Sequence, residues 1–192
     1  MALSDRKKAL TLALQDSEEL VKAAASRALD RLEGLERLPA ISEAASSGQK
    51  PDRIRAIHFL GFLNTDKSVD RMLAFLQDPD PDIRVATVKA VQTYLPERAF
   101  VPLLGSLEDP DVSVVQSVIE ALSHYRDPRV TEFLLPFLIG SNAETACVTA
   151  EGLGRNGDPK AEPYLIKVLQ ETSNPFLKAR TAEALGNLRP DA

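Results

Sequence analysis

Tryptophan is absent from the sequence, and aromatic residues make up only 5% of it. The chain therefore offers few large flat side chains on which nucleic-acid bases could stack. It also lacks an excess of basic residues, because its formal net charge is -5 at pH 7. A partner dominated by phosphate groups is bound mainly through cationic side chains. Both shortages argue against a nucleic-acid partner.

Cysteine and histidine, which serve many catalytic and metal sites, are nearly missing as well. Cys147 is the single cysteine, so no internal disulfide can form, which fits a reducing compartment. His58 and His124 stand in neither an HExxH pattern nor a cluster with cysteine. Glu144 and Glu151 flank Cys147 at helical spacing, and their negative charge disfavours the reactive thiolate. We therefore expect no catalytic residue, no metal site and no cofactor.

Long apolar runs are also missing. In residues 1–16, apolar positions recur at helical spacing and are interrupted by Lys7 and Lys8. This pattern is typical of neither a secretory signal peptide nor a membrane span. We therefore expect a cytoplasmic protein without a membrane partner.

What the sequence does contain is a repeat of 31 residues. One series of apolar residues at this spacing lies in the first helix of each expected unit: Leu10, Ile41, Met72, Leu103, Leu134 and Leu165. Another lies in the second helix of each unit and shifts by one residue at its last member: Leu29, Leu60, Val91, Leu122, Leu153 and Leu185. Two independent series at one spacing predict about six two-helix units.

The stretch 77–94, QDPDPDIRVATVKAVQTY, shows how one unit is built. A turn at Asp78-Pro79-Asp80 is followed by Pro81, which suits the first position of a helix because its missing N–H costs nothing there. Residues of one stripe then recur at helical spacing and are expected in the core: Ile83, Thr87, Ala90, Val91 and Tyr94. A similar outline follows at 108–125.

The repeat also predicts the helix ranges. First helices are expected near 4–15, 37–47, 67–77, 98–108, 129–140 and 160–171. Second helices are expected near 17–33, 51–63, 80–94, 111–125, 142–155 and 174–188. The spacing continues throughout, so we expect one domain over residues 1–192. Its repeats are expected at approximately 3–35, 36–65, 66–96, 97–127, 128–158 and 159–190.

The Asp-Pro-Asp turn, the Ile83-Arg84 pair that follows it and the helix ending Ala184-Leu185-Gly186 resemble the HEAT-repeat superfamily. The likeness is to its short-repeat branch, similar to the phycobilisome-lyase HEAT-like repeats. The resemblance implies an all-α fold, a right-handed α-α superhelix (solenoid) of about six two-helix repeats.

By the same resemblance, an aspartate of a turn pairs with a basic residue of a second helix, which forms a ladder between units. The basic member is present at four equivalent positions: Lys22, Arg53, Arg84 and Lys178. Val115 and Ala146 occupy the other two. We therefore expect the ladder to be interrupted in the fourth and fifth units.

The resemblance further implies that second helices line the concave face. Their exposed side is expected at the positions equivalent to 23, 27 and 30. The middle position changes from basic to acidic along the chain: Arg27, His58, Lys89, Glu120, Glu151 and Glu183. Two interpretations stand, ordinary solvated charge or a polarised groove that orients a partner with complementary ends.

The position equivalent to 23 carries apolar residues beside this charge: Ala23, Ile54, Val85, Gln116, Cys147 and Ala179. It predicts either an adhesive patch or contact with the helix of an adjacent unit. The candidate partner-binding residues are both positions of the four central units: Ile54, His58, Val85, Lys89, Gln116, Glu120, Cys147 and Glu151.

Together these patterns favour a non-enzymatic scaffold or adaptor that binds a partner protein or peptide on its concave face. The alternative, implied only by the repeat subtype, is a bilin lyase or lyase-like subunit acting on a tetrapyrrole chromophore. Terminal units of a solenoid need a polar outer face, and Leu12 makes the first unit less polar than expected. Either the array associates end to end, or this chain is part of a longer one.

Overall fold

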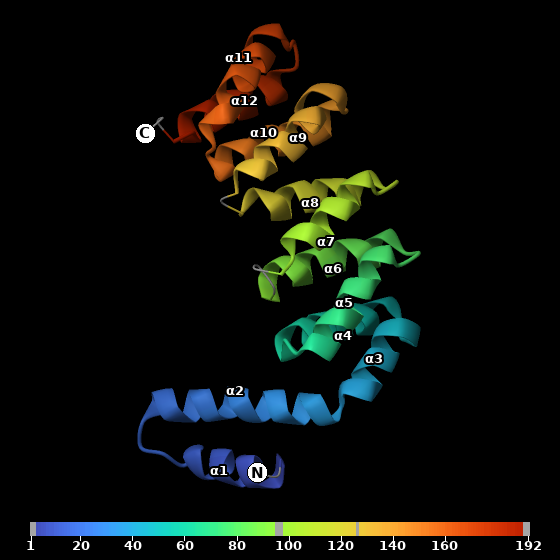
Figure 1. Cartoon of the computed structure of the whole chain (residues 1–192), viewed down its shortest axis with the longest axis vertical. Coiled ribbons are helices and arrows are strands. Elements are labelled where there is room, and N and C mark those ends of the chain that lie inside the picture. The colour runs from blue at the N-terminus through green and yellow to red at the C-terminus, as the bar shows by residue number, and fades with distance from the viewer. Residues whose placement is uncertain (1–2, 95–97, 126, 190–192) are drawn as a thin grey trace. The chain divides into compact units, whose positions relative to one another are not determined.

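The computed structural model describes residues 3–94, 98–125 and 127–189, and within these ranges it contains helices and turns but no strand (Figure 1). The first helices of the pairs are α1 (Leu3–Ala13), α3 (Leu38–Ser47), α5 (Asp66–Ala74), α7 (Phe100–Gly105), α9 (Pro128–Gly140) and α11 (Glu162–Glu171). The second helices are α2 (Glu19–Glu36), α4 (Lys50–Leu63), α6 (Pro81–Tyr94), α8 (Val112–Ser123), α10 (Ala143–Asn156) and α12 (Pro175–Asn187). Short 3-10 segments extend or introduce three first helices: η1 (Phe75–Gln77), η2 (Ser106–Glu108) and η3 (Pro159–Ala161). The predicted all-α repeat fold is confirmed.

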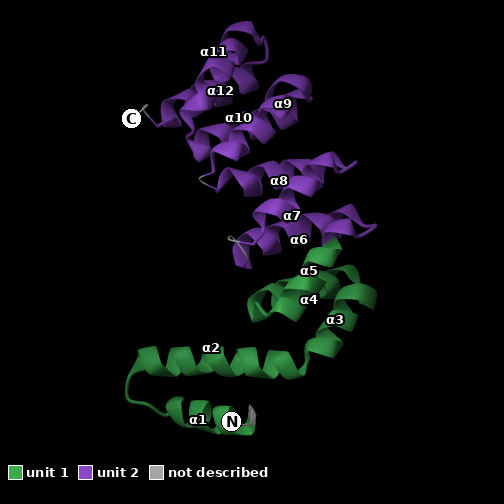
Figure 2. Ribbon diagram, viewed as in Figure 1, with its two compact units in different colours: residues 1–75 green, residues 76–192 purple. Residues whose placement is uncertain are grey.

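The helices form two compact units, Met1–Phe75 and Leu76–Ala192 (Figure 2). In unit 1, α1 packs on α2 and α3 on α4, while α2 and α5 also contact α4. In unit 2, each second helix contacts the next, in the order α6, α8, α10 and α12. The single domain over residues 1–192 and the right-handed winding of the array stay predictions.

Side-chain caps place helix starts where the sequence predicted them. Asp127 Oδ1 accepts a hydrogen bond from the amide of Arg129, and Asn174 Oδ1 accepts one from the amide of Phe176. A proline follows each cap at the start of α9 and of α12, where no amide donor is needed. Gly157 ends α10 with a φ of 72°, the left-handed conformation that glycine adopts without strain.

The core follows the predicted apolar series. Four members in the first helices are fully buried: Met72, Leu103, Leu134 and Leu165. Four in the second helices are buried equally well: Leu60, Val91, Leu122 and Leu153. The members in the first units, Leu10, Leu29 and Ile41, are only half-buried. Of the stripe predicted for α6, only Tyr94 is half-buried, and its other members are fully buried.

Helices α10 and α12 approach closely at Gly154. A Cβ atom on Gly154 would lie 2.6 Å from the Cα atom of Ala184, which is too close for any residue other than glycine without a backbone shift. Glycine at this position allows the two neighbouring second helices to pack closely.

One rung of the predicted ladder is present inside unit 2. Arg84 on α6 forms two hydrogen bonds of 2.7 Å with the carboxylate of Asp109, from Nε to Oδ2 and from Nη2 to Oδ1. Its Nη1 also donates to the carbonyl of Asp78 at 2.7 Å. Val115 and Ala146 are buried at the next two equivalent positions, where neither can donate such bonds. The interruption is confirmed there.

Candidate functional site

The middle position of the predicted stripe is exposed in nearly every second helix. Its exposed members are Arg27, Lys89, Glu120, Glu151 and Glu183, and His58 is half-buried. In unit 2 this position lies once on each of α6, α8, α10 and α12, and each of these helices contacts the next. We call the surface marked by Lys89, Glu120, Glu151 and Glu183 the second-helix face.

The position equivalent to 23 is less open. Ile54, Val85, Gln116 and Cys147 are all half-buried. Gln116 Nε2 lies 3.2 Å from Thr145 Oγ1 on the next second helix, so this side chain contacts the adjacent unit. Of the two interpretations, contact with a neighbouring helix therefore accounts for Gln116.

The surroundings of Cys147 act on the pKa of its thiol. Burial raises its pKa, and the charge of Glu144 raises it further, against the opposing effect of Arg180. The thiolate is therefore disfavoured at neutral pH.

The position equivalent to 30 was predicted to be exposed, and in the middle of the chain this is wrong. Gly61, Ser123 and Gly154 are buried, and Gln92 is half-buried. At Gly154 the reason is the close approach of α12, which covers this side of α10. A helical wheel for a single helix gives no information about a neighbour that packs on its flank.

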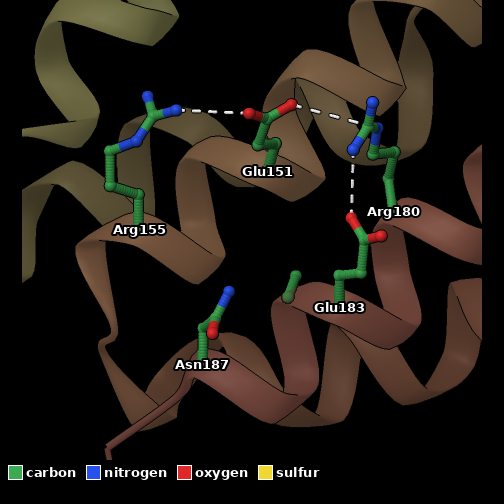
Figure 3. Close-up of a pocket in the computed structure, with 6 residues that line it drawn as sticks. Glu151, Arg155, Arg180, Glu183 and Asn187 are labelled. Carbon is green, nitrogen blue, oxygen red and sulfur yellow. Dashed lines mark hydrogen bonds and ion pairs between the residues drawn. The ribbon is translucent and has the colours of Figure 1, made fainter.

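A pocket of about 240 Å³ opens on the second-helix face between α10 and α12 (Figure 3). Its lining combines two carboxylates, two guanidinium groups and one amide: Glu151, Arg155, Arg180, Glu183 and Asn187, with Ala184 beside them. Glu151 is the one predicted candidate residue that lines it. Glu183 was named in the stripe but not among the candidates, and the other four lining residues were missed.

The charges of the pocket form a chain of ion pairs. Glu151 lies between the two arginines, with Oε1 3.2 Å from Arg155 Nη2 and Oε2 4.0 Å from Arg180 Nε (Figure 3). Arg180 Nη1 also lies 3.0 Å from Glu183 Oε2. Hydrogen bonding to Glu183 and the charges of Glu183 and Glu151 raise the pKa of Arg180. At this end of the stripe, the glutamates are therefore balanced by arginines.

Two of these pairs could have been found in the sequence. Glu151 and Arg155 are four residues apart, and Arg180 and Glu183 are three apart, spacings at which helical side chains meet. The contact between Glu151 and Arg180 has no such signal, because it requires α12 to lie beside α10.

Ile54 and His58 belong to unit 1, and the remaining six candidate residues belong to unit 2. A continuous binding surface through all eight stays a prediction. Among the described residues, no group of three or more His, Cys, Asp or Glu side chains is arranged to hold a metal ion. None of the helices seen in the described ranges is long and apolar enough to cross a bilayer.

Comparison with solved structures finds similar helical proteins, and the two matches with TM-scores above 0.5 show the same fold. The E. coli protein YibA matches with a TM-score of 0.55 at 19% identity, covering 96% of this chain and 69% of YibA. An engineered protein matches with a TM-score of 0.53 at 15% identity, covering 95% and 96% of the two chains. The complex of CpcE and CpcF of phycocyanin lyase from a Nostoc species matches with a TM-score of 0.46 at 22% identity, covering 94% and 76%.

The likenesses to YibA and to the engineered protein show the fold alone, and the bilin-lyase alternative stays an untested prediction. A comparison with curated proteins finds no match. The family model described as HEAT repeats matches residues 38–123 and, overlapping them, 69–145, together more than half of the chain. This chain belongs to the HEAT-repeat family.

Proposed function

We propose that this protein is a non-enzymatic scaffold that holds a partner protein or peptide on its second-helix face, centred on the pocket between α10 and α12. The observation that carries the proposal is the mixed lining of that pocket. Exposed groups of both signs converge there from two helices, and an amide completes the set. HEAT repeats are built to present such extended surfaces, because each unit adds one more second helix to the same face.

The chemistry of the pocket indicates a polar partner that carries both charges. Arg155 and Arg180 can each offer a planar pair of donors to a carboxylate, and Glu151 can accept from a cation. The existing ion pairs are solvent-exposed, and such pairs contribute only about 0–1 kcal/mol each. A partner can therefore exchange its own charged groups for them at little cost.

The rest of the face extends the site beyond the pocket. Glu120 on α8 and Lys89 on α6 are exposed at the same repeat position as Glu151. Packed helices lie roughly 8–10 Å apart, a distance that an extended peptide spans in about three residues. We expect a bound segment to place a polar or charged residue at about every third position along the face.

The test compares partners captured by three forms of the chain. Wild-type protein, the Arg180→Glu variant and the Lys167→Glu control are each used as bait in a native host lysate, and bound proteins are quantified by mass spectrometry. The control carries the same charge change on α11, at an exposed residue outside the pocket. A partner retained by wild type and control but lost from Arg180→Glu is expected.

Direct binding of that partner then completes the test. We expect its affinity for Arg180→Glu to fall at least about tenfold, because a reversed charge faces the group that Arg180 recognised. Equal affinity for all three forms would place the binding surface elsewhere and overturn the proposal.

A further inference from the structure

The rung between Arg84 and Asp109 shows how two neighbouring units of this chain recognise each other. Arg84 reaches from a second helix to the carboxylate of the next turn, where both oxygens accept. The backbone orients that carboxylate, because Asp109 Oδ1 also accepts from the amide of Asp111 at 2.9 Å. The pair lies in buried surroundings, with side-chain exposures of 11% and 7%.

At the other end of unit 2, α12 carries the basic half of such a rung. Lys178 occupies the repeat position of Arg84, and its side chain is exposed. Within the described ranges it forms no ion pair. Inside the array this repeat position forms an ion pair with the next turn, but on α12 it is exposed to solvent.

At the start of unit 1, the turn after α1 carries the acidic half. Asp16 occupies the repeat position of Asp109 and is exposed. Its Oδ1 accepts from the amide of Glu18 at 2.9 Å, which is the same local geometry that orients Asp109. Over the described residues no basic side chain pairs with Asp16, although its carboxylate is already oriented for one.

Each half also has uncovered apolar residues close to it in the sequence. Near Asp16, Leu14 is 38% exposed and Val21 is 37% exposed, whereas their equivalents Leu107 and Val114 are 7% and 0% exposed. Four residues after Lys178 on α12, Ala182 is exposed, whereas its equivalent Ala150 is fully buried. Positions that neighbouring units cover inside the array are thus uncovered beside α1 and α2 and on α12.

We propose that a second copy of this chain docks head to tail, with the α11–α12 face of one copy against the α1–α2 face of the next. Lys178 of the first copy pairs with Asp16 of the second, as Arg84 pairs with Asp109 within one chain. Leu14 and Val21 then pack against the exposed side of α12 at Ala182. Charge complementarity selects the second copy as the occupant, because the two faces carry opposite members of one rung.

This contact joins two different surfaces, so it leaves one of each free on every dimer. Association of this kind continues by further additions unless rotation closes a ring. The measured mass should therefore rise steadily with concentration, rather than stop at a dimer. The proposal is independent of the second-helix face, because it uses neither the pocket nor its arginines.

The experiment is sedimentation velocity on the whole chain between about 1 µM and about 0.5 mM, the range in which weak contacts of this type are populated. Lys178→Glu and Asp16→Lys are measured separately and then as an equimolar mixture. Each variant alone places like charges at the contact, so we expect at least about tenfold weaker association. In the mixture every contact between unlike variants joins opposite charges, so association should return.

Lys89→Glu serves as the control, because it makes the same charge change at an exposed site of α6, outside both docking faces. Circular dichroism of each variant verifies that it is folded. A wild-type chain that stays monomeric throughout the range would overturn the proposal. So would association that both single variants retain, or a mixture that remains as dissociated as its components.

Discussion

In unit 2, three repeat positions are buried on an interior second helix and exposed on α12. Arg84 is buried against Asp109, whereas Lys178 is exposed. Gly154 touches the backbone of Ala184, whereas a Cβ on Gly186 would meet nothing within 4 Å. Ala150 is fully buried, whereas Ala182 is exposed. The sequence places similar residues at both sites, so the difference in burial arises from the neighbours.

This difference shows where the stability of the fold resides. A single helix pair buries only part of its apolar surface, and the next pair completes the core. A residue in an interior unit therefore contacts neighbouring units on both sides, whereas a residue in a terminal unit contacts a neighbour on one side only. Substitutions at matched interior and terminal positions should separate the two contributions.

The largest difference is expected between Arg84→Met and Lys178→Met. Removing Arg84 leaves the buried Asp109 without its cation, and breaking a buried pair in this way costs about 3–5 kcal/mol. Lys178→Met removes an exposed charge and should change stability by less than about 0.5 kcal/mol. Urea unfolding followed by circular dichroism measures both, and equal losses would contradict the buried rung.

The same rung has a pH dependence of defined sign. Burial raises the pKa of Asp109, but hydrogen bonds from Arg84 and the Asp111 amide, with the charge of Arg84, outweigh it and hold the pKa below its ordinary value. The contribution of the pair is therefore complete above the unfolded-state pKa and is lost as pH falls through the folded-state pKa. Below about pH 4, the ordinary carboxyl range, wild type should lose more stability than Asp109→Asn does.

Leu103→Ala and Leu10→Ala test the apolar core at one repeat position. Leu103 is fully buried, and truncation of such a leucine costs about 2–5 kcal/mol. Leu10 is half-buried, so we expect a loss of about 1 kcal/mol from its smaller buried area. A loss below about 1 kcal/mol for Leu103→Ala would mean that the core does not pass through it.

Gly154→Ala and Gly186→Ala form the next pair. The added methyl group at 154 meets the Ala184 backbone, and such overpacking costs about 1–3 kcal/mol. At 186 the methyl group points into open space, and alanine favours a helix over glycine by about 1 kcal/mol. Thermal unfolding should therefore move to lower temperature for Gly154→Ala and stay constant or rise for Gly186→Ala.

Most of the fold could be predicted from the sequence, because a helix boundary depends on local chemistry. The start of α9 follows from Asp127 and Pro128, and the end of α10 follows from Gly157. The series through Leu103 and Leu134 identifies the core, since a repeated unit must bury the same residue each time.

The candidate site could be predicted only in part. Glu151 was found because it repeats at a fixed spacing, but Arg180 was missed because its contact with Glu151 spans two helices. Gly154 and Ser123 were expected on the exposed side and are buried, because a helical wheel contains no information about the adjacent unit. Such contacts depend on how the helices pack.

Val85→Glu tests the second-helix face at its other end and should have only a small effect on stability. Val85 is half-buried and lies one helical turn before the exposed Lys89. The carboxylate of a glutamate at position 85 can therefore reach solvent, and stability should fall by less than about 1 kcal/mol.

If the partner binds along the whole face, an added negative charge at position 85 should abolish binding. Val101→Glu makes the same change at a residue of α7 that is 73% exposed, outside the second helices, and should leave binding intact. Titration calorimetry with the captured partner measures both. Undiminished binding by Val85→Glu would restrict the site to the pocket between α10 and α12, where the two arginines lie.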